Sequence, residues 1–462
     1  MGRQFRTVDY AATLARSVRL RDCLAADHLA RFIAEVLPLL DFAPLYARYG
    51  HRGGAPYRPE LLCGRLVYGY ATGVFSSRKI EAATYESAPF RFLAGNQHPD
   101  HDTLASFRKT VLPELQQLFV QVLLLAQETG LLQVGNISVD GTKMHAHAAK
   151  RKAVSYQRLT ALATPCAAAI AAWFTLAEEP DRGRLPDGLV VAEEVARRQD
   201  RLARLAAAKR ALAARAAART AAEQADYDDK LAARADRQQR TGRGPGGRAP
   251  VPSIPGPRPT DQDNVTDPES RIMKHCTNQG GAQQYNGQIA VTQDSRLLVG
   301  HTVAHHPNDY AEAVPTVESI PTALGTPTAA ALDTGFCSAK NIAGLAARGI
   351  RPLIATGREA HHRDWQTRFA APLLPPPAAA SPCVKMAYAL QTPSGKAMYR
   401  LRKSTVEPVF GSIKATLGFR QCSLRGLAAT AGEWSVVCLA YNLRRLHTLV
   451  LGVACVLGGL AR

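Results

Sequence analysis

Apolar side chains recur at helical spacing through the first 130 residues. In residues 25–40 they return every three or four positions, which places them on one face of a helix. Similar patterns follow, with Pro59 in the first turn of one segment and Gly130 just after the last. These further segments are residues 57–70, 76–85, 102–110 and 112–129. We therefore predict an all-α N-terminal domain over residues 1–132. This domain either contacts DNA ends or is a structural bundle with solvated charges.

Short apolar runs separated by turn residues begin at residue 136 and predict strands. Further along, the pattern alternates between strand and helix with short connections, which predicts parallel strand pairs. Strands are expected at residues 136–140, 143–148, 285–292, 297–303, 329–333 and 350–356, and helices at 309–324 and 338–348. The strands at 136–140, 285–292 and 297–303 would form an antiparallel meander, and helix, strand, helix, strand and a further helix around Glu407 follow it. We therefore predict an α/β fold with a ribonuclease H-like mixed sheet and flanking helices.

An inserted segment of different composition divides this α/β domain into residues 133–149 and 266–447. Residues 150–240 are dominated by Ala, Arg, Leu and Glu. Ala is the best helix former, and Arg-rich helix faces are usually solvated. We predict two or three long helices here, over residues 161–177 and 192–237. A partly disordered arm is the alternative.

Two further segments complete the predicted organisation. Residues 241–265 are rich in Gly, Pro and Arg, so they predict a linker without regular structure. Residues 448–462 are apolar and predict a C-terminal helix. The apolar run 449–460 is too short to span a bilayer, so a buried helix without membrane association is expected.

Charge and cysteine usage narrow the class of protein. Lys and Arg number 57 against 38 Asp and Glu, a formal net charge of +19. This excess favours a polyanionic partner such as nucleic acid, the alternative being a generically basic cytosolic protein. The nine cysteines show no Cys-x-x-Cys spacing, which disfavours a zinc site and fits free thiols in the cytoplasm. The first ten residues are polar and charged, unlike a secretory signal.

Three acidic residues lie where a metal-dependent nuclease would need them. Asp140 ends the apolar run Ile137-Ser138-Val139, and Asp333 ends another at residues 329–332. A carboxylate at the end of a buried strand is held rigidly and faces a cleft. Glu407 is the single acid in residues 396–425, among Lys396, Arg400, Arg402, Lys403, Lys414, Arg420 and Arg425. Alone, an Asp before Gly or Thr-Gly is often a turn residue. Together, the three carboxylates can bind a pair of Mg²⁺ ions for phosphoryl transfer.

Several motifs, in order along the chain, resemble those of bacterial insertion-sequence transposases of the DDE type. The resemblance covers most of the chain outside residues 150–263. The N-terminal runs Tyr57-Arg58-Pro59, Pro99-Asp100-His101-Asp102-Thr103 and Phe107-Arg108-Lys109 are similar to the helical domain of that family. The catalytic domain matches through Val139-Asp140-Gly141-Thr142-Lys143, residues 266–273, Tyr285-Asn286-Gly287-Gln288, Pro307-Asn308-Asp309, Leu332-Asp333-Thr334-Gly335 and Val406-Glu407-Pro408-Val409-Phe410-Gly411.

The C-terminal signature of the family is Tyr, two residues, Arg, three residues, Glu, six residues and Lys. Tyr399 and Arg402 keep the first spacing, and Glu407 and Lys414 keep the last. Four residues separate Arg402 from Glu407, whereas Lys403 stands at the spacing of three. Either cation is therefore a candidate for contacting phosphate. The complete set of predicted DNA- or phosphate-binding residues is Lys143, Tyr399, Arg402, Lys403 and Lys414.

The resemblance implies DNA cleavage and strand transfer at terminal inverted repeats. Asp140, Asp333 and Glu407 would be the catalytic residues and the ligands of two Mg²⁺ ions, with Mn²⁺ as the alternative ion. Asn286 and Asp309 either position a carboxylate or close a turn. The implied partners are the DNA of the element ends and of the target, and further copies of the chain in a dimer or larger complex on DNA, in the cytoplasm at the nucleoid.

Two other functions remain open from the sequence. One is a catalytically silent DNA-binding protein derived from a transposase, and the other is a ribonuclease H-like DNA nuclease. His145 and His147 would share a strand face and could imitate a metal pair. A strand-surface role fits these two better, because no third ligand accompanies them.

Overall fold

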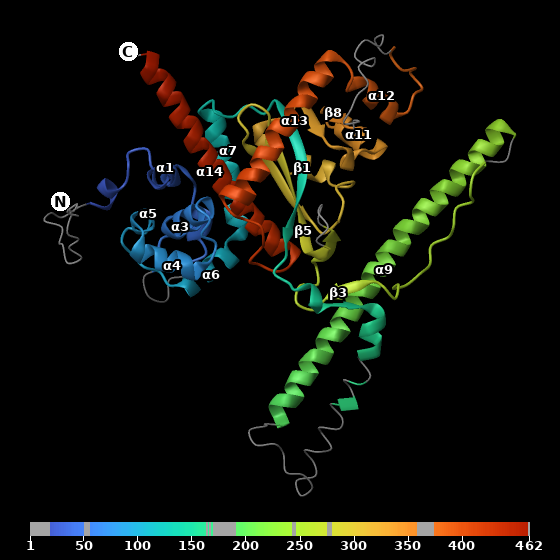
Figure 1. The fold of residues 1–462 in the computed structure, drawn as a ribbon, viewed down its shortest axis with the longest axis horizontal. Coiled ribbons are helices and arrows are strands. Elements are labelled where there is room, and N and C mark those ends of the chain that lie inside the picture. Colours follow the sequence, from blue (N-terminus) through green and yellow to red (C-terminus); the bar gives the residue numbers. More distant parts are fainter. Residues whose placement is uncertain are drawn as a thin grey trace, which may run out of the picture.

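The structure, a computed structural model, describes residues 19–49, 56–162, 165, 168–169, 191–242, 246–274, 280–357 and 374–460. It contains a helical N-terminal region, a mixed sheet with helices on both faces, and a long helix that projects from the body (Figure 1). This architecture confirms the predicted α/β class and the helical N-terminal region.

The N-terminal region is built from short helices, as predicted. They are η1 (Leu20–Cys23), α1 (Leu29–Val36), η2 (Leu37–Leu39), α2 (Ala43–Tyr46), α3 (Pro59–Ala71), α4 (Ser77–Glu86), α5 (Ala88–Leu93), α6 (His101–Thr110) and α7 (Leu112–Glu128). The cap of α6 is Asp100, one of whose carboxylate oxygens accepts a hydrogen bond from the Thr103 amide at 2.6 Å. Gly130 follows α7 with a φ of 72°, the left-handed conformation that glycine adopts easily.

The sheet has the strand order and directions of a ribonuclease H-like fold. Its strands are β1 (Asn136–His145), β4 (Arg271–Lys274), β5 (Gly281–Thr292), β6 (Leu298–Ala304), β7 (Ala329–Leu332) and β8 (Arg351–Ile354). The hydrogen-bonded order is β4-β5-β1-β7-β8. Strands β4 and β6 both pair with the edge of β5 that faces away from β1, β4 along residues 281–284 and β6 along residues 286–291. Strands β1, β5 and β6 form an antiparallel meander, whereas β1, β7 and β8 run parallel. Only one strand, β1, occupies the region where we expected two, because the chain continues extended through Gly141.

Helices cover the two faces of the sheet. Asp140 pairs with Ile289, and Ile289 pairs with His301, so these three side chains share one face. Arg402 of α13 (Pro393–Gly411) bonds Asp140, and Ser435 of α14 (Leu427–Leu460) bonds His301, which places both helices on this face. The opposite face is covered by α10 (Ala313–Glu318) and α11 (Ala339–Ala346). The expected helix at 309–324 is shorter, with α10 followed by the 3₁₀ turn η4 (Thr322–Leu324) after Pro321.

Helix α14 joins the N-terminal region to the sheet. It packs on α3, α7 and β6, and its Trp434 is fully buried and donates from its ring nitrogen to the Gln288 carbonyl at 3.2 Å. The predicted helix at 448–462 is the continuation of α14, which runs unbroken from Leu427. By length and composition, Leu427–Val453 could cross a membrane, but half of its most apolar window is buried inside the protein. This burial is that of a core helix.

A buried polar cluster also ties the two regions together. The hydroxyl of Tyr70 on α3 donates to Glu433 on α14 at 2.8 Å, and Arg108 on α6 donates to the same hydroxyl at 3.1 Å. The second oxygen of Glu433, which is fully buried, accepts from the amides of Ser423 and Leu424. Because each carboxylate oxygen of Glu433 is satisfied, the cluster fixes the helical region against the sheet.

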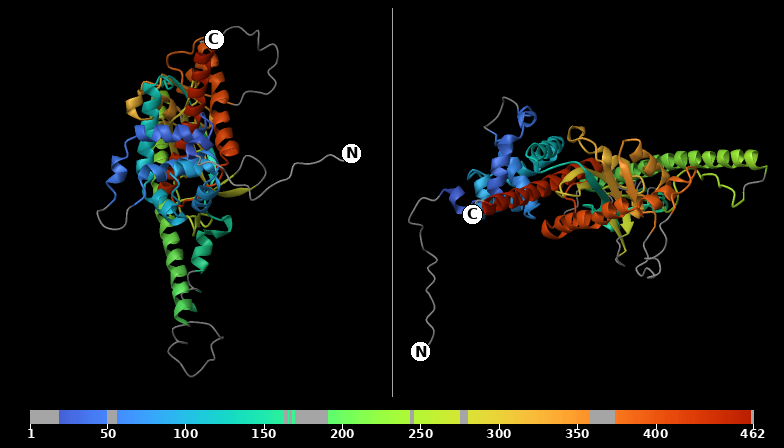
Figure 2. Two further views of the ribbon diagram at one scale, coloured as in Figure 1. Left: turned by 90° about the vertical axis from the view of Figure 1, so that its left-hand side faces the viewer. Right: turned by 90° about the horizontal axis from the view of Figure 1, so that it is seen from above.

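The insertion forms an arm around one long helix. Helix α9 (Val191–Thr241) has 51 residues, about 75 Å at 1.5 Å per residue, and extends away from the body (Figures 1 and 2). The base of the arm contains η3 (Lys150–Lys152) and the antiparallel pair β2 (Ala153–Ser155) and β3 (Gln262–Asn264). Most of the expected helix at 161–177 lies outside the described residues.

The segment predicted as a linker, residues 241–265, runs back along α9. Thr241 still belongs to α9, residues 246–261 have no helix or strand, and β3 follows. Ion pairs hold this segment to the helix: Arg219 contacts Asp261 at 3.0 Å, and Arg215 contacts Asp263. The absence of regular secondary structure in 246–261 was predicted, but its attachment to α9 was not.

Candidate active site

The register of the sheet brings Asp140 and Asp333 together. Val139 of β1 and Leu332 of β7 form the last pair of the parallel ladder. Asp140 and Asp333 are the next residues on these two neighbouring strands, which in a sheet lie about 4.8 Å apart. Strand β7 ends there while β1 continues to His145. The two carboxylates therefore stand at the edge where the sheet opens.

A single arginine lies between these two carboxylates. The Nη2 atom of Arg402 is 2.8 Å from Oδ2 of Asp140 and 3.8 Å from Oδ2 of Asp333. Its side chain is only 8% exposed, on the buried face of α13 with Thr405, Val406 and Val409. Two carboxylate oxygens thus converge on one positive group in a largely desolvated position.

Burial dominates the acid–base behaviour of Asp140. Loss of hydration raises the pKa of its carboxyl from 3.8 to about 7, because the charged form is poorly solvated there. The Arg402 guanidinium opposes this rise and the Asp333 carboxylate adds to it. The Gly141 amide donates to the second carboxylate oxygen of Asp140 at 2.9 Å. The charged form of Asp140 is therefore only partly stabilised by Arg402 and the Gly141 amide.

Asp309 approaches the same edge from the opposite face of the sheet. Its Oδ1 accepts hydrogen bonds from Asn286 Nδ2 at 2.7 Å and from Gln288 Nε2 at 2.6 Å. A side chain at Gly141 would be blocked, since an added Cβ would lie 2.4 Å from Oδ1 of Asp309. The structure thus brings Asn286 and Asp309 into contact, and their supporting role stays a prediction. Gln288 was missed, although its alternation with Asn286 on β5 was a usable signal.

The Asp333 side chain also shapes the turn that follows β7. Its Oδ1 accepts from the Gly335 amide at 2.8 Å and caps the 3₁₀ turn η5 (Thr334–Phe336). The turn role that is common for such an Asp is therefore present. The Asp333 side chain therefore caps the turn with Oδ1 and places Oδ2 near Arg402.

Glu407 is not joined to the aspartate pair. It lies one residue beyond Val406, which faces the sheet, so its side chain points about 100° away around the helix and is exposed. Within the described ranges, it takes part in no hydrogen bond or ion pair that links it to Asp140 or Asp333. The same ranges contain no group of three His, Cys, Asp or Glu side chains arranged to hold a metal ion.

The predicted phosphate-binding cations occupy different settings. Arg402 is buried against the aspartates, whereas Lys403 next to it is exposed. Lys143 lies three residues from Asp140 on β1 and therefore on the opposite face, where its Nζ donates to the Lys274 carbonyl at 2.9 Å. Lys414 falls in the π-helical turn η7 (Ser412–Thr416), which interrupts the regular α-helical spacing between Glu407 and Lys414. Tyr399 is half-buried on α13.

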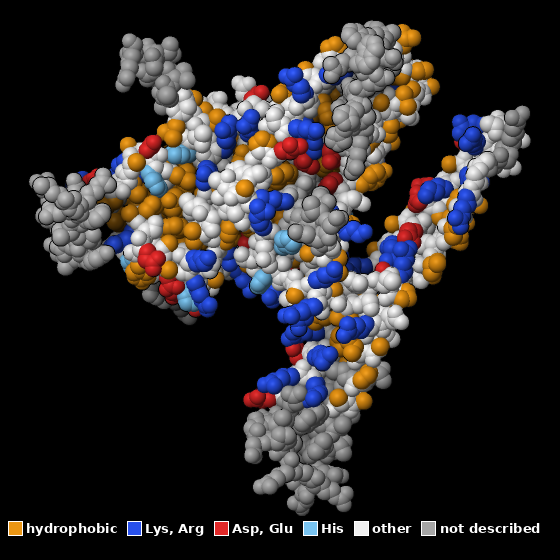
Figure 3. Space-filling model, viewed as in Figure 1, with side chains coloured by type: hydrophobic (Ala, Val, Ile, Leu, Met, Phe, Trp, Pro, Cys, Tyr) orange, Lys and Arg blue, Asp and Glu red, His pale blue; other side chains and the backbone are white. Residues whose placement is uncertain are grey.

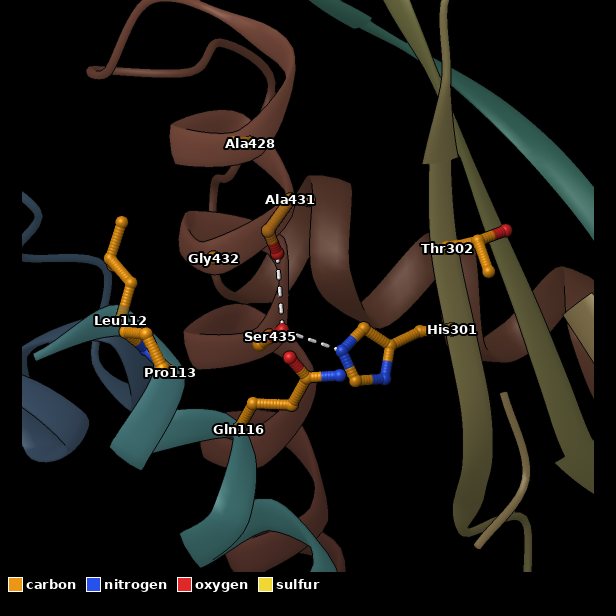
Figure 4. A pocket seen from close by; sticks show the side chains of 9 residues that line it. All are labelled: Leu112, Pro113, Gln116, His301, Thr302, Ala428, Ala431, Gly432 and Ser435. Carbon is orange, nitrogen blue, oxygen red and sulfur yellow. Dashed lines mark hydrogen bonds between the residues drawn. The ribbon is translucent and has the colours of Figure 1, made fainter. Parts of the chain in front are cut away.

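A separate cavity lies between α7, β6 and α14, away from the carboxylates (Figure 4). It has a volume of about 180 Å³ and contains a hydrogen bond of 2.6 Å between His301 Nε2 and Ser435 Oγ. Burial lowers the pKa of His301 to about 4, so the ring is neutral at physiological pH. Because no carboxylate is among the described residues that line it, this cavity is a poor candidate for phosphoryl transfer.

The surface around the aspartates carries both signs of charge. Figure 3 shows acidic side chains gathered beside α13, with Lys and Arg side chains on the surrounding surface. Such an arrangement suits a polyanion that approaches a group of carboxylates, because the surrounding cations offset its charge.

Comparison with known families identifies both ends of the chain. Residues 18–110, from η1 to α6, match the transposase domain DUF772, and residues 378–447 match a transposase DDE domain. The second match includes Arg402, Glu407 and Lys414, whereas Asp140 and Asp333 lie between the two matched ranges. No curated protein and no solved structure shows significant similarity to the chain. Two transposase-domain matches on one chain, with a ribonuclease H-like sheet, support an insertion-sequence DDE-type transposase.

Proposed function

We propose that this transposase cleaves DNA at the terminal inverted repeats of its element and transfers the strands to a target. Asp140, Asp333 and Glu407 are the proposed catalytic carboxylates. The observation that carries the proposal is the convergence of Asp140 and Asp333 on one nitrogen of Arg402, at 2.8 and 3.8 Å. Two acids that meet at an open sheet edge form a site for positive charge. A divalent metal ion can supply that charge in place of the Arg402 guanidinium.

The residues at this edge fit a divalent cation in the chemistry of their donors. Mg²⁺ and Mn²⁺ prefer carboxylate oxygens, and Asp140 and Asp333 offer them from two rigid strands. Burial raises the pKa of Asp140 to about 7, and a cation bound beside this carboxylate would stabilise its charged form. Two bound ions would activate the attacking hydroxyl and stabilise the leaving oxygen. Glu407 is the proposed third ligand and must approach from the exposed flank of α13.

The chain's own residues then have separate roles. Asp309, fixed by Asn286 and Gln288, supports the β1 backbone beside Asp140 and so holds that carboxylate in place. Arg402 neutralises the aspartate pair from α13. Lys403, Tyr399, Lys414 and Lys143 are proposed to contact the DNA backbone. The proposed working form is a dimer or larger complex on DNA in the cytoplasm, because strand transfer joins two ends.

The test is cleavage and joining of a DNA duplex carrying the element ends, with Mg²⁺ or Mn²⁺, by the full chain. Asp140→Asn, Asp333→Asn and Glu407→Gln should each lower the rate by about a thousandfold, the equivalent of about 4 kcal/mol of barrier. Asp294→Asn is the matched control, since Asp294 is exposed in the turn between β5 and β6. Equal activity of the Asp140 variant and the control would refute the proposal.

A second function is favoured by the position of Glu407. With that carboxylate apart from the aspartates and Arg402 between them, a catalytically silent DNA-binding protein is the alternative. The same assay separates the two, because the silent protein would bind end DNA and give no cleavage that depends on Asp140. Cleavage with no preference for the element ends would instead indicate a nuclease.

A further inference from the structure

A basic groove lies at the base of the arm, away from the carboxylates. It is a hollow of about 530 Å³ between the η3–β2 segment and the first part of α9. Its floor includes Val154, Leu162 and Leu205. Among the described residues that line it, the cations are Arg151, Lys152, Arg158, Arg197, Arg201 and Arg204, and Asp200 is the single acid.

Most of the positive charge in this basic groove is unbalanced. Arg204 forms an ion pair with Asp200, and Arg197 lies 3.6 Å from Glu193. The side chains of the other four cations form no ion pair or hydrogen bond with any residue that the structure describes. These four are Arg151, Lys152, Arg158 and Arg201.

Several cations further along α9 are paired with acidic side chains. Further along the helix, Arg215 pairs with Asp263, Arg219 with Asp261, Lys230 with Asp226 and Arg240 with Asp236. Arg210 and Arg237 also have no acidic partner within the described residues, but they are far apart along α9, whereas the unpaired cations of the basic groove lie close together. A surface that keeps exposed cations close together without acids suits an anionic partner.

The walls of the basic groove are held in place by their own packing. Leu159 from the helical residues 156–162 packs against Leu205, Ala208 and Leu212 of α9 in a small core separate from that of the body. The β2–β3 pair closes the base, and the Val265 amide donates to the Lys152 carbonyl. The cations thus project from a supported frame.

We propose that the basic groove binds the sugar–phosphate backbone of duplex DNA beyond the stretch held at the carboxylates. The proposal rests on the proposed function, because the DNA is the duplex that the carboxylates cleave. Lys and Arg side chains gather on the lower part of the arm, on the same face of the molecule as the acidic patch beside α13 (Figure 3). One duplex crossing this face can contact both regions. The contact is independent of base sequence, since point charges along a backbone read no bases.

The test compares two double charge reversals in the full chain. Arg158→Glu with Arg201→Glu changes the basic groove, and Arg210→Glu with Arg237→Glu is the control. Both control residues are exposed on α9 outside the groove, and each double variant changes the formal net charge by the same amount. Both are made with Asp140→Asn to prevent cleavage. Affinity for a duplex of random sequence is measured by fluorescence anisotropy over a series of salt concentrations.

The groove variant should bind at least about tenfold more weakly, and its plot of log affinity against log salt should flatten by about 2, corresponding to two lost phosphate contacts. The control should change by less than about threefold in affinity, because one or two isolated surface charges act weakly. Equal losses in the two variants, or no loss in either, would overturn the proposal. Circular dichroism of both variants verifies that α9 remains folded.

A photocrosslinker at residue 158 supplies a second measurement that does not depend on affinity. It should label duplex DNA in the otherwise unchanged chain, whereas a crosslinker at residue 210 should not. Labelling of an acidic protein segment in place of DNA would contradict the proposal. If the groove contact is found while cleavage never depends on Asp140, the groove stands and the proposed catalytic function fails.

Discussion

The carboxylate edge of the sheet and the basic groove of the arm hold their charges in contrasting ways. At the edge, Asp140 and Arg402 have side chains only 18% and 8% exposed, and they are paired. In the groove, Arg158 and Arg201 are exposed and have no acidic partner within the described residues. One region contains few charges in fixed positions, and the other contains many charges open to solvent.

This difference predicts how each region works. Burial lowers the effective dielectric constant, so each interaction at the edge is strong and sensitive to small displacements. In the exposed groove, solvent and salt screen each charge, so the effect there comes from the sum. Catalysis requires a few charges in fixed positions, whereas binding of a long polyanion requires many charges open to solvent.

The largest effect that would test this contrast is the loss of the buried arginine. Arg402→Met should lower the free energy of unfolding by about 3–5 kcal/mol, because it leaves two carboxylates without their cation. Arg201→Met, its exposed counterpart, should change that free energy by less than about 0.5 kcal/mol. Urea denaturation in EDTA measures both.

Adding Mg²⁺ sharpens this first prediction. If a metal ion can neutralise the aspartates, it should restore part of the stability of Arg402→Met and have little effect on Arg201→Met. Equal free energies of unfolding for the two variants in EDTA would show that the buried pair is no more coupled than a surface charge.

A second, comparable effect concerns pH. The pKa of Asp140 is raised from 3.8 to about 7 in the folded protein, so between these values the folded state binds a proton that the unfolded state has released. Stability from this group is therefore present at low pH and is lost as pH rises towards 7. At the full shift the loss is at most about 4 kcal/mol.

Asp140→Asn should abolish this loss, so its stability should fall less between pH 5 and pH 8 than that of the unchanged chain. Asp294→Asn, the exposed control, should keep the full dependence. Denaturation at the two pH values in EDTA measures the difference. Identical pH profiles for the Asp140 variant and the unchanged chain would show that Asp140 is not desolvated in solution.

The sequence predicted the buried strands that carry Asp140 and Asp333, and the physical reason is local. Apolar runs lead up to both aspartates, and the parallel pairing of β1 with β7 places them side by side, although β1 continues past Asp140 to His145. Asp309 accepts a hydrogen bond from Asn286, and the predicted supporting role of these two residues stays a prediction. These features depend on strand patterns that a few neighbouring residues specify.

Features set by tertiary packing were not predictable from the sequence. The rotation of α13 about its axis decides that Arg402 faces the aspartates and Glu407 faces solvent, and side-chain packing sets that rotation. The helix predicted at 192–237 is confirmed as α9, whereas most of the helix predicted at 161–177 lies outside the described residues. Gly141 resembled a turn residue, yet β1 passes straight through it.

The smallest predicted effect tests why that glycine is there. A Cβ at Gly141 would lie 2.3 Å from Gln288 Nε2 and 2.4 Å from Asp309 Oδ1, so Gly141→Ala must displace both side chains from the β1 backbone. We expect a loss of about 1–3 kcal/mol in the free energy of unfolding. The displaced Asp309 would also leave the backbone beside Asp140 less supported, so cleavage should slow as well.

Gly135→Ala, where no atom lies within 4 Å of the added carbon, should change neither quantity. If the two variants behave alike in urea denaturation and in the cleavage assay, the close approach of Asp309 does not position Asp140. The fixed geometry that distinguishes the carboxylate edge from the basic groove would then depend on Arg402 alone.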